Sequence, residues 1–196
     1  MTPSLQPELP HGIHLAPVRQ RYAPLFCFAL LTASCALASF ALACATPFAA
    51  FAVTAAAMLP LQTALLAVTG AWLVNQAIGF GVLHYPIDTN TILWGFAIGA
   101  AALAATATSA AVLRVLSGAL PHHRTPLALA AGLIGAYGVY ELALFAATPF
   151  LGGVEAFTAA IVIRLGAIST VWLVGLVAAC EVVRLLNPLR RGQAVS

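Results

Sequence analysis

The sequence predicts an all-α protein, a polytopic bundle of transmembrane helices. Its 196 residues are 62% hydrophobic and only 7% charged, whereas soluble domains carry about a quarter charged residues. The apolar residues gather into runs of about 20, the length that crosses a hydrocarbon core of roughly 30 Å as a helix. These runs lack the apolar-polar alternation of a transmembrane β-strand, so helices are the expected spans.

Three regions follow from the distribution of apolar residues along the chain. Residues 1–23 form a polar N-terminal tail, residues 24–186 the transmembrane helical domain, and residues 187–196 a basic C-terminal tail. We expect the first apolar run to be retained, because it is long for the apolar region of a cleaved signal peptide. About five spans are predicted, at 25–45, 61–83, 92–116, 127–147 and 156–185.

The stretch 47–59 is also apolar, but it is shorter than a span and lies between Pro47 and Pro60. A helix of this length does not cross the bilayer, and proline ends or kinks helices. We therefore expect a re-entrant or interfacial segment. A sixth full span at this place is the alternative.

The placement of arginine carries the information on orientation. The net charge of +3 is small and spread over several loops, which favours a topology signal over a nucleic-acid-binding surface. With five spans, Arg114 and Arg124 lie on the side opposite Arg19 and Arg21. The excess of arginine then favours the N-terminus out and the C-terminus in, in a bacterial inner membrane. With six spans, all the arginines outside the spans would lie inside.

Two segments resemble each other closely enough to indicate a duplicated helical hairpin. Residues 70–80 align with residues 135–145, with Trp72 opposite Tyr137 and Gln76 opposite Glu141. Two hairpins, at 61–116 and 127–185, would then be copies in the same orientation, the parallel kind of repeat found in some transporters. The alternative is a chance match between helices rich in alanine and leucine.

Four polar residues inside the predicted spans form the candidate site: Asn75, Gln76, Glu141 and Arg164. An ionisable side chain at mid-membrane costs roughly 3 kcal/mol or more, so it turns inward to a partner or a cavity. Glu141 and Arg164 lie at similar depth on neighbouring spans, which predicts an ion pair between them. The four residues are interpreted either as polar contacts that fix helix packing or as a solute or proton site.

The turn above this layer contains His84 and Asp88, which form a candidate mouth of the site. The competing interpretation is a hairpin anchored at the interface, with both side chains solvated. Trp94 is expected in the aromatic belt at the membrane surface.

Other patterns are weak. The four cysteines lie in apolar segments without a metal-ligand spacing, so we expect small buried hydrophobic residues. The adjacent His122 and His123 do not match the i,i+4 spacing of a helical metal site. Gly95 and Gly99 predict close helix packing, within the chain or between chains. No catalytic motif is present, so the sequence supports neither an enzyme nor a cofactor or metal.

The favoured function is a small-solute or ion permease, or a component of one, whose substrate the sequence does not identify. The alternative is a non-transporting membrane subunit or assembly protein, which predicts a closed, dry interior. Expected partners are the lipid bilayer and a second copy or another membrane subunit, with no nucleic acid.

Overall fold

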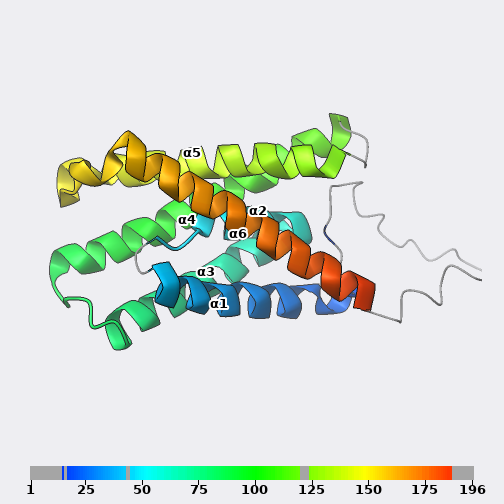
Figure 1. Ribbon diagram of the computed structural model, residues 1–196, viewed down its shortest axis with the longest axis horizontal. Coiled ribbons are helices and arrows are strands. Elements are labelled where there is room, and N and C mark those ends of the chain that lie inside the picture. The colour runs from blue at the N-terminus through cyan, green and yellow to red at the C-terminus, as the bar shows by residue number, and fades with distance from the viewer. Residues whose placement is uncertain (1–14, 16, 43–44, 120–123, 187–196) are drawn as a thin grey trace, which may run out of the picture.

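The computed structural model describes residues 15, 17–42, 45–119 and 124–186, and this part of the chain consists of helices joined by turns and loops, without strands (Figure 1). Five of its helices are long and apolar enough to cross a membrane, as predicted. The basic tail at 187–196, His122–His123 and most of the 1–23 tail lie outside the described residues. The long helices are α1 (Ala23–Leu42), α3 (Leu61–Gly81), α4 (Thr89–Ala119), α5 (Thr125–Leu151) and α6 (Ala159–Leu186).

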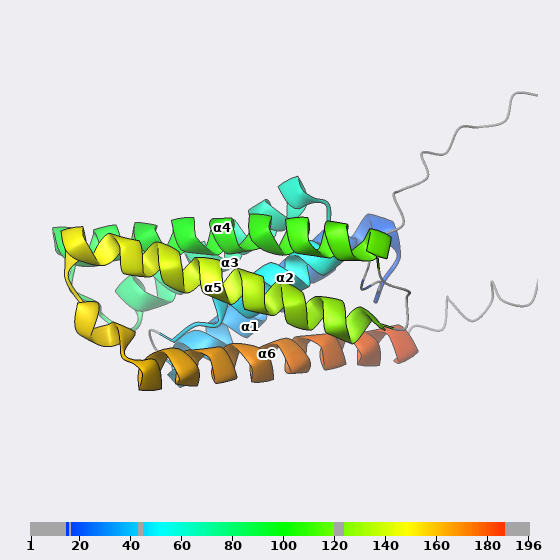
Figure 2. The ribbon, with the colours of Figure 1, turned by 90° about the horizontal axis from the view of Figure 1, so that it is seen from above.

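The remaining helix, α2 (Phe48–Met58), lies in the middle of the bundle (Figures 1 and 2). Its 11 residues measure about 17 Å at the helical rise, so α2 is too short to be a sixth span. All of them are buried, and α2 packs against α3, α4, α5 and α6. The stretch is therefore a buried half-length helix, and an interfacial position does not fit it.

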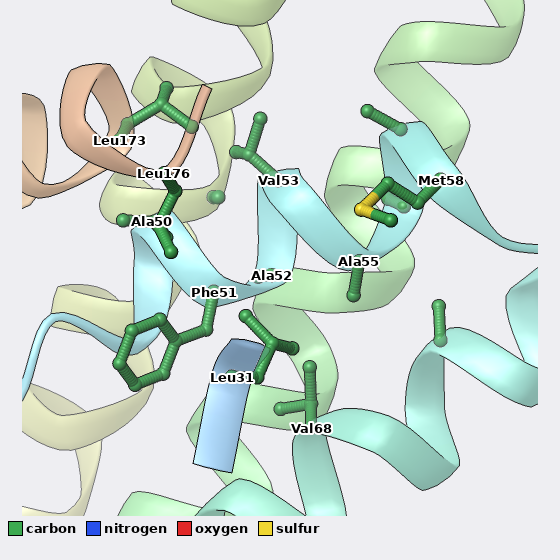
Figure 3. Close-up of a cluster of buried hydrophobic side chains, with 14 of the residues drawn as sticks. Leu31, Ala50, Phe51, Ala52, Val53, Ala55, Met58, Val68, Leu173 and Leu176 are labelled. Carbon is green, nitrogen blue, oxygen red and sulfur yellow. The ribbon is translucent and has the colours of Figure 1, made fainter. Parts of the chain in front are cut away.

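Small side chains allow the long helices to close around α2. Six of its residues are alanines, which let neighbouring backbones approach. Its largest side chains fill the remaining space: Phe51 lies beside Leu31 of α1 and near Val68 of α3, and all three are fully buried (Figure 3). The other side of α2 faces Leu173 and Leu176 of α6 (Figure 3).

The path of α2 corrects the predicted arrangement of the chain ends. The start of α1 and the end of α6 lie at the same end of the bundle (Figures 1 and 2). Trp172 Nε1 of α6 donates to Ser34 Oγ of α1 at 2.6 Å. Further toward the C-terminal end of α6, the Cys180 thiol donates to the sulfur of Met58, the last residue of α2. The prediction for five spans, with the N-terminus out and the C-terminus in, placed these two ends on opposite sides, whereas α2 brings the chain back toward the end from which α1 started.

The connection between α5 and α6 follows from the residues at the end of α5. Pro149 lies inside α5 and has no N–H, so it cannot donate to the carbonyl of Phe145. The Thr148 hydroxyl donates to that carbonyl instead, at 2.8 Å. Gly152 and Gly153 then adopt φ of +78° and +85°, values that favour glycine. The chain continues into the short 3-10 helix η3 (Val154–Phe157), which leads to α6.

Candidate functional site

A cavity of about 810 Å³ lies between the first residues of α2 and the α5–η3–α6 connection. Its position follows from the shortness of α2, which occupies the middle of the bundle only toward the end where α1 starts (Figure 2). Residues 45–47, which precede α2, are not helical and leave the other half unfilled. Every element except α3 and the short 3-10 helix η1 (Gln20–Tyr22) contributes to the lining.

Aromatic and polar side chains both line the cavity. The aromatic residues are Phe40, Phe48, Trp94, Tyr137, Tyr140 and Phe157. The polar residues are Thr46, Glu141, Arg164 and Ser169. Glu141 and Arg164 are the two charged residues among them. A large, mostly apolar pocket with a few polar groups is the usual form of a small-molecule site.

Glu141 is half-buried on α5, with the Tyr137 hydroxyl within side-chain hydrogen-bonding range of its carboxylate. Tyr137, one turn earlier, lies beside it. The Tyr137 hydroxyl has a single proton, which it donates to the main-chain carbonyl of Val162 on α6. That proton therefore does not neutralise Glu141.

Arg164 lies on α6 and lines the same cavity, but it does not bind Glu141. In the described part of the chain the one ion pair within 4.0 Å joins Arg184 to Glu181 near the C-terminal end of α6. The predicted Glu141–Arg164 ion pair is therefore wrong, although the two residues do share a site. Depth along the helix axis was read correctly, but the rotation of each helix about its axis decides whether two side chains meet.

Asn75 and Gln76 lie outside the large cavity and line a smaller pocket of about 120 Å³. Asn75 Nδ2 donates to Ser39 Oγ and to Thr46 Oγ1, both at 3.0 Å. Gln76 Nε2 donates to Asn75 Oδ1 at 3.3 Å. These bonds join α3 to α1 and to the segment before α2, so Asn75 is a packing residue. Three side chains line both spaces and separate them: Phe48, Trp94 and Ile98.

His84 and Asp88 do not form a mouth for the cavity, because neither is among its lining residues. Asp88 caps α4: its carboxylate accepts from the Thr91 N–H at 2.9 Å and from the Thr91 hydroxyl at 3.0 Å. These bonds lower the pKa of Asp88. His84 is exposed, and its φ of +54° turns the chain so that Tyr85 lies over Gly79 of α3.

The structure repeats one packing unit in the two hairpins. Trp72 of α3 donates from Nε1 to the Gly95 carbonyl of α4 at 2.9 Å, and its ring covers Gly99 one turn later. Tyr137 of α5 donates to the Val162 carbonyl of α6, and its ring covers Gly166 one turn later. Trp72 and Tyr137 are the residues that the sequence alignment places opposite each other. Chance similarity of composition does not explain the same hydrogen bond and the same ring-on-glycine contact in both hairpins.

This correspondence also relates the two cavities. Pairing the two carbonyls and the two glycines places Ala97 of α4 opposite Arg164 of α6, and Gln76 is already opposite Glu141. Five lining residues of the small pocket then have counterparts in the large cavity. The pairs are Asn75 with Tyr140, Gln76 with Glu141, Gly79 with Leu144, Trp94 with Ile161, and Ile98 with Leu165. The large cavity therefore occupies a position in the second hairpin similar to that of the small pocket in the first, and it is larger and lined by charged residues.

Sequence reasoning missed the residues that shape this cavity. Trp94 lines the cavity, whereas the sequence predicted that it would lie in the aromatic belt at the membrane surface. Thr46 and Ser169 also line the cavity, and neither was predicted from the sequence. The duplication was the available signal, because Trp72 and Tyr137 mark where each hairpin closes. The predicted contact at Gly95 and Gly99 is made within the chain, since Gln76 and Trp72 cover these glycines. Cys27, Cys35 and Cys180 are buried and free, as expected, and Cys44 lies outside the described residues.

No family model, curated protein or solved structure matches the chain.

Proposed function

We propose that the protein is a small-solute permease, or the solute-binding component of one, and that the solute occupies the cavity beside Glu141 and Arg164. The observation that carries this proposal is the pair of opposite charges that line one cavity without binding each other. Charges within a membrane domain are expensive and mark substrate and ion paths. A half-length helix whose N-terminal end lies at such a cavity is a recurring feature of transporters.

The duplicated hairpin argues against a purely structural role for the two charges. The first hairpin makes the same aromatic hydrogen bond and the same ring-on-glycine contact with Gln76 and Ala97 at the corresponding positions. The packing unit therefore does not need a carboxylate or a guanidinium at these positions. Charges that packing does not require are best explained by a ligand.

The alternative is a membrane subunit that transports nothing, and it predicts a closed, dry interior. The hydrogen bonds of Asn75 agree with the structural role that this alternative assigns to the amides. The cavity of about 810 Å³ does not agree with it. We therefore favour solute binding for Glu141 and Arg164, and packing for Asn75.

For location we propose a bacterial inner membrane, on the basis of the helical bundle, with the arginine-rich end inside. Arg19 and Arg21 precede α1, Arg114 lies near the end of α4, and Arg124 begins α5; together with Arg184 they occupy one end of the bundle (Figures 1 and 2). Arginine is concentrated on the cytoplasmic side of inner-membrane proteins. The cavity then lies toward the opposite, outer side.

Cysteine labelling tests whether the cavity is open to water. Ser169 is buried and lines the cavity, whereas Ser109 of α4 is buried away from it. In a background without native cysteines, we expect Ser169→Cys to react with a membrane-impermeant methanethiosulfonate applied from the outer side. The matched control, Ser109→Cys, should not react. Equal protection of both cysteines would overturn the proposal and favour the dry subunit.

A further inference from the structure

We infer that the solute is a zwitterion, with an ammonium group and a carboxylate on an apolar or aromatic body. This inference rests on the proposed function, because it assigns the chemistry of a ligand to the same cavity. The lining of the cavity contains equal numbers of negatively and positively charged side chains. One carboxylate, Glu141, and one guanidinium, Arg164, face the same space, and each lacks an ion-pair partner within the described residues.

A solute with only one charge would satisfy one of these side chains and leave the other without a counterion. Glu141 is half-buried and Arg164 is exposed at the surface of the bundle, and an unpaired charge is costly wherever that surface lies within a membrane. A zwitterion provides a partner for both side chains and adds no net charge to the membrane interior. The charges of the cavity therefore select against singly charged analogues.

The orientation of the solute follows from the surrounding groups. Its carboxylate would bind Arg164, since a guanidinium presents two parallel donors to a carboxylate. Phe48 and Ala49, at the N-terminal end of α2, also line the cavity, and this end of a helix favours an anionic group. Its ammonium group would bind Glu141, beside Tyr137 and Tyr140.

The apolar part of the solute has a matching environment. Trp94 and Phe157 line the cavity together with Phe40, and aromatic rings favour contact with apolar and aromatic groups. The corresponding pocket of the first hairpin is much smaller, at about 120 Å³. Tyr85 lines that pocket and covers Gly79. The second hairpin has Leu144 at the position of Gly79, and Phe150, in the last turn of α5, is 87% exposed and does not cover the cavity.

The experiment uses two matched series of probes and the melting temperature of the purified full-length protein. One series is phenylalanine, phenethylamine and hydrocinnamate; the other is aminocaproate, hexylamine and hexanoate. A ligand that binds only the folded state raises the melting temperature. We expect the zwitterion of at least one series to raise it more than either singly charged analogue at the same concentration.

Single variants provide a test that general destabilisation cannot imitate. In Glu141→Gln the remaining guanidinium should prefer the anionic probe over the cationic one. In Arg164→Ala the preference should be reversed. Both variants carry the residue that the first hairpin has at the corresponding position, so we expect them to fold. The zwitterion should bind roughly tenfold to hundredfold more weakly to each, because one charged hydrogen bond is lost.

The double variant Glu141→Gln with Arg164→Ala should lose the preference for the zwitterion altogether. The matched control is Glu181→Gln with Arg184→Ala. It removes the exposed ion pair near the C-terminal end of α6, away from the cavity, and should bind the probes like the parent protein. Equal stabilisation by a singly charged probe, unchanged preferences in the single variants, or no stabilisation by any probe would overturn the zwitterion. If Ser169→Cys is nevertheless labelled, only the ligand class has failed and the permease proposal stands.

Discussion

At the scale of single residues, the hairpins are closed by an aromatic ring that lies on a glycine. A Cβ atom added to Gly99 would lie 2.8 Å from the Trp72 ring, and one added to Gly166 would lie 3.2 Å from the Tyr137 ring. Both distances are shorter than ordinary van der Waals contact. The two glycines are therefore required by close approach, and the ring of Trp72 has less freedom to adjust than that of Tyr137.

This difference predicts a graded effect of alanine substitution. Gly99→Ala should displace Trp72 from its hydrogen bond with Gly95 and lower the free energy of unfolding by about 1–3 kcal/mol, as overpacking does. Gly166→Ala should cost less. Gly175→Ala is the control, because nothing lies within 4 Å of an added Cβ, and alanine should stabilise α6 there by up to about 1 kcal/mol. Unfolding in mild detergent measures all three, and a loss at Gly175 equal to that at Gly99 would contradict the packing argument.

At the residue scale the sequence located the polar side chains but not their partners. Glu141 and Arg164 were recognised because charge is rare in an apolar span, and both line the cavity. Their ion pair was not formed, and Asn75 binds Ser39 and Thr46 instead. Position along the chain gives the depth of a side chain, since the helical rise is constant. It does not give the rotation of one helix relative to another, which packing decides.

At the scale of secondary-structure elements, α2 organises the bundle. The sequence predicted a re-entrant or interfacial segment at 47–59 from two prolines and a length below that of a span. The structure places α2 within the centre, against all five long helices. The sequence could not show this position, because an alanine-rich apolar helix suits lipid and a protein interior equally. The cavity also escaped prediction, since it results from the half of the central space that α2 leaves unfilled.

The central position of α2 predicts that its side chains matter more than exposed residues of the same type. Phe51 is fully buried between α1 and α3, whereas Phe150 is 87% exposed. Phe51→Ala should lower the free energy of unfolding by about 3–5 kcal/mol, because it leaves a void that the bundle fills only partly. Phe150→Ala should change it by less than about 0.5 kcal/mol. Chemical unfolding in detergent compares the two, and similar losses would show that α2 does not hold the bundle together.

At the scale of the whole molecule, two copies of a hairpin enclose a pair of unlike helices, α1 and α2. The turns that close the two hairpins lie at the same end of the bundle (Figures 1 and 2). This is the parallel arrangement that the sequence alignment predicted. The two hairpins differ at the cavity. The first has the uncharged Gln76 and Ala97, and the second has Glu141 and Arg164 at the corresponding positions. The charged side chains that line the cavity therefore both lie in the second hairpin.

The path of the chain through the whole bundle decides which helix ends share a side of the membrane. If α2 did not return the chain, five crossings would place Gln20, before α1, on the side of Val154 in the α5–α6 connection. In the structure Gln20, which begins η1, lies instead at the same end of the bundle as the C-terminal end of α4, where Ser117 is found (Figure 2). This arrangement brings the described arginines outside the cavity to one end. It therefore removes the conflict with the positive-inside tendency that a five-span reading leaves.

Single cysteines at these three exposed positions test the arrangement in a background without native cysteines. An impermeant maleimide applied to intact spheroplasts should label Val154→Cys and should not label Gln20→Cys or Ser117→Cys. In inverted membrane vesicles the pattern should be reversed, because the arginine-rich end then faces the reagent. Ser117→Cys is the internal control, since both arrangements place it opposite Val154→Cys. Labelling of Gln20→Cys together with Val154→Cys would mean that the chain crosses an odd number of times. The return through α2, and with it the half-filled centre that forms the cavity, would then be wrong.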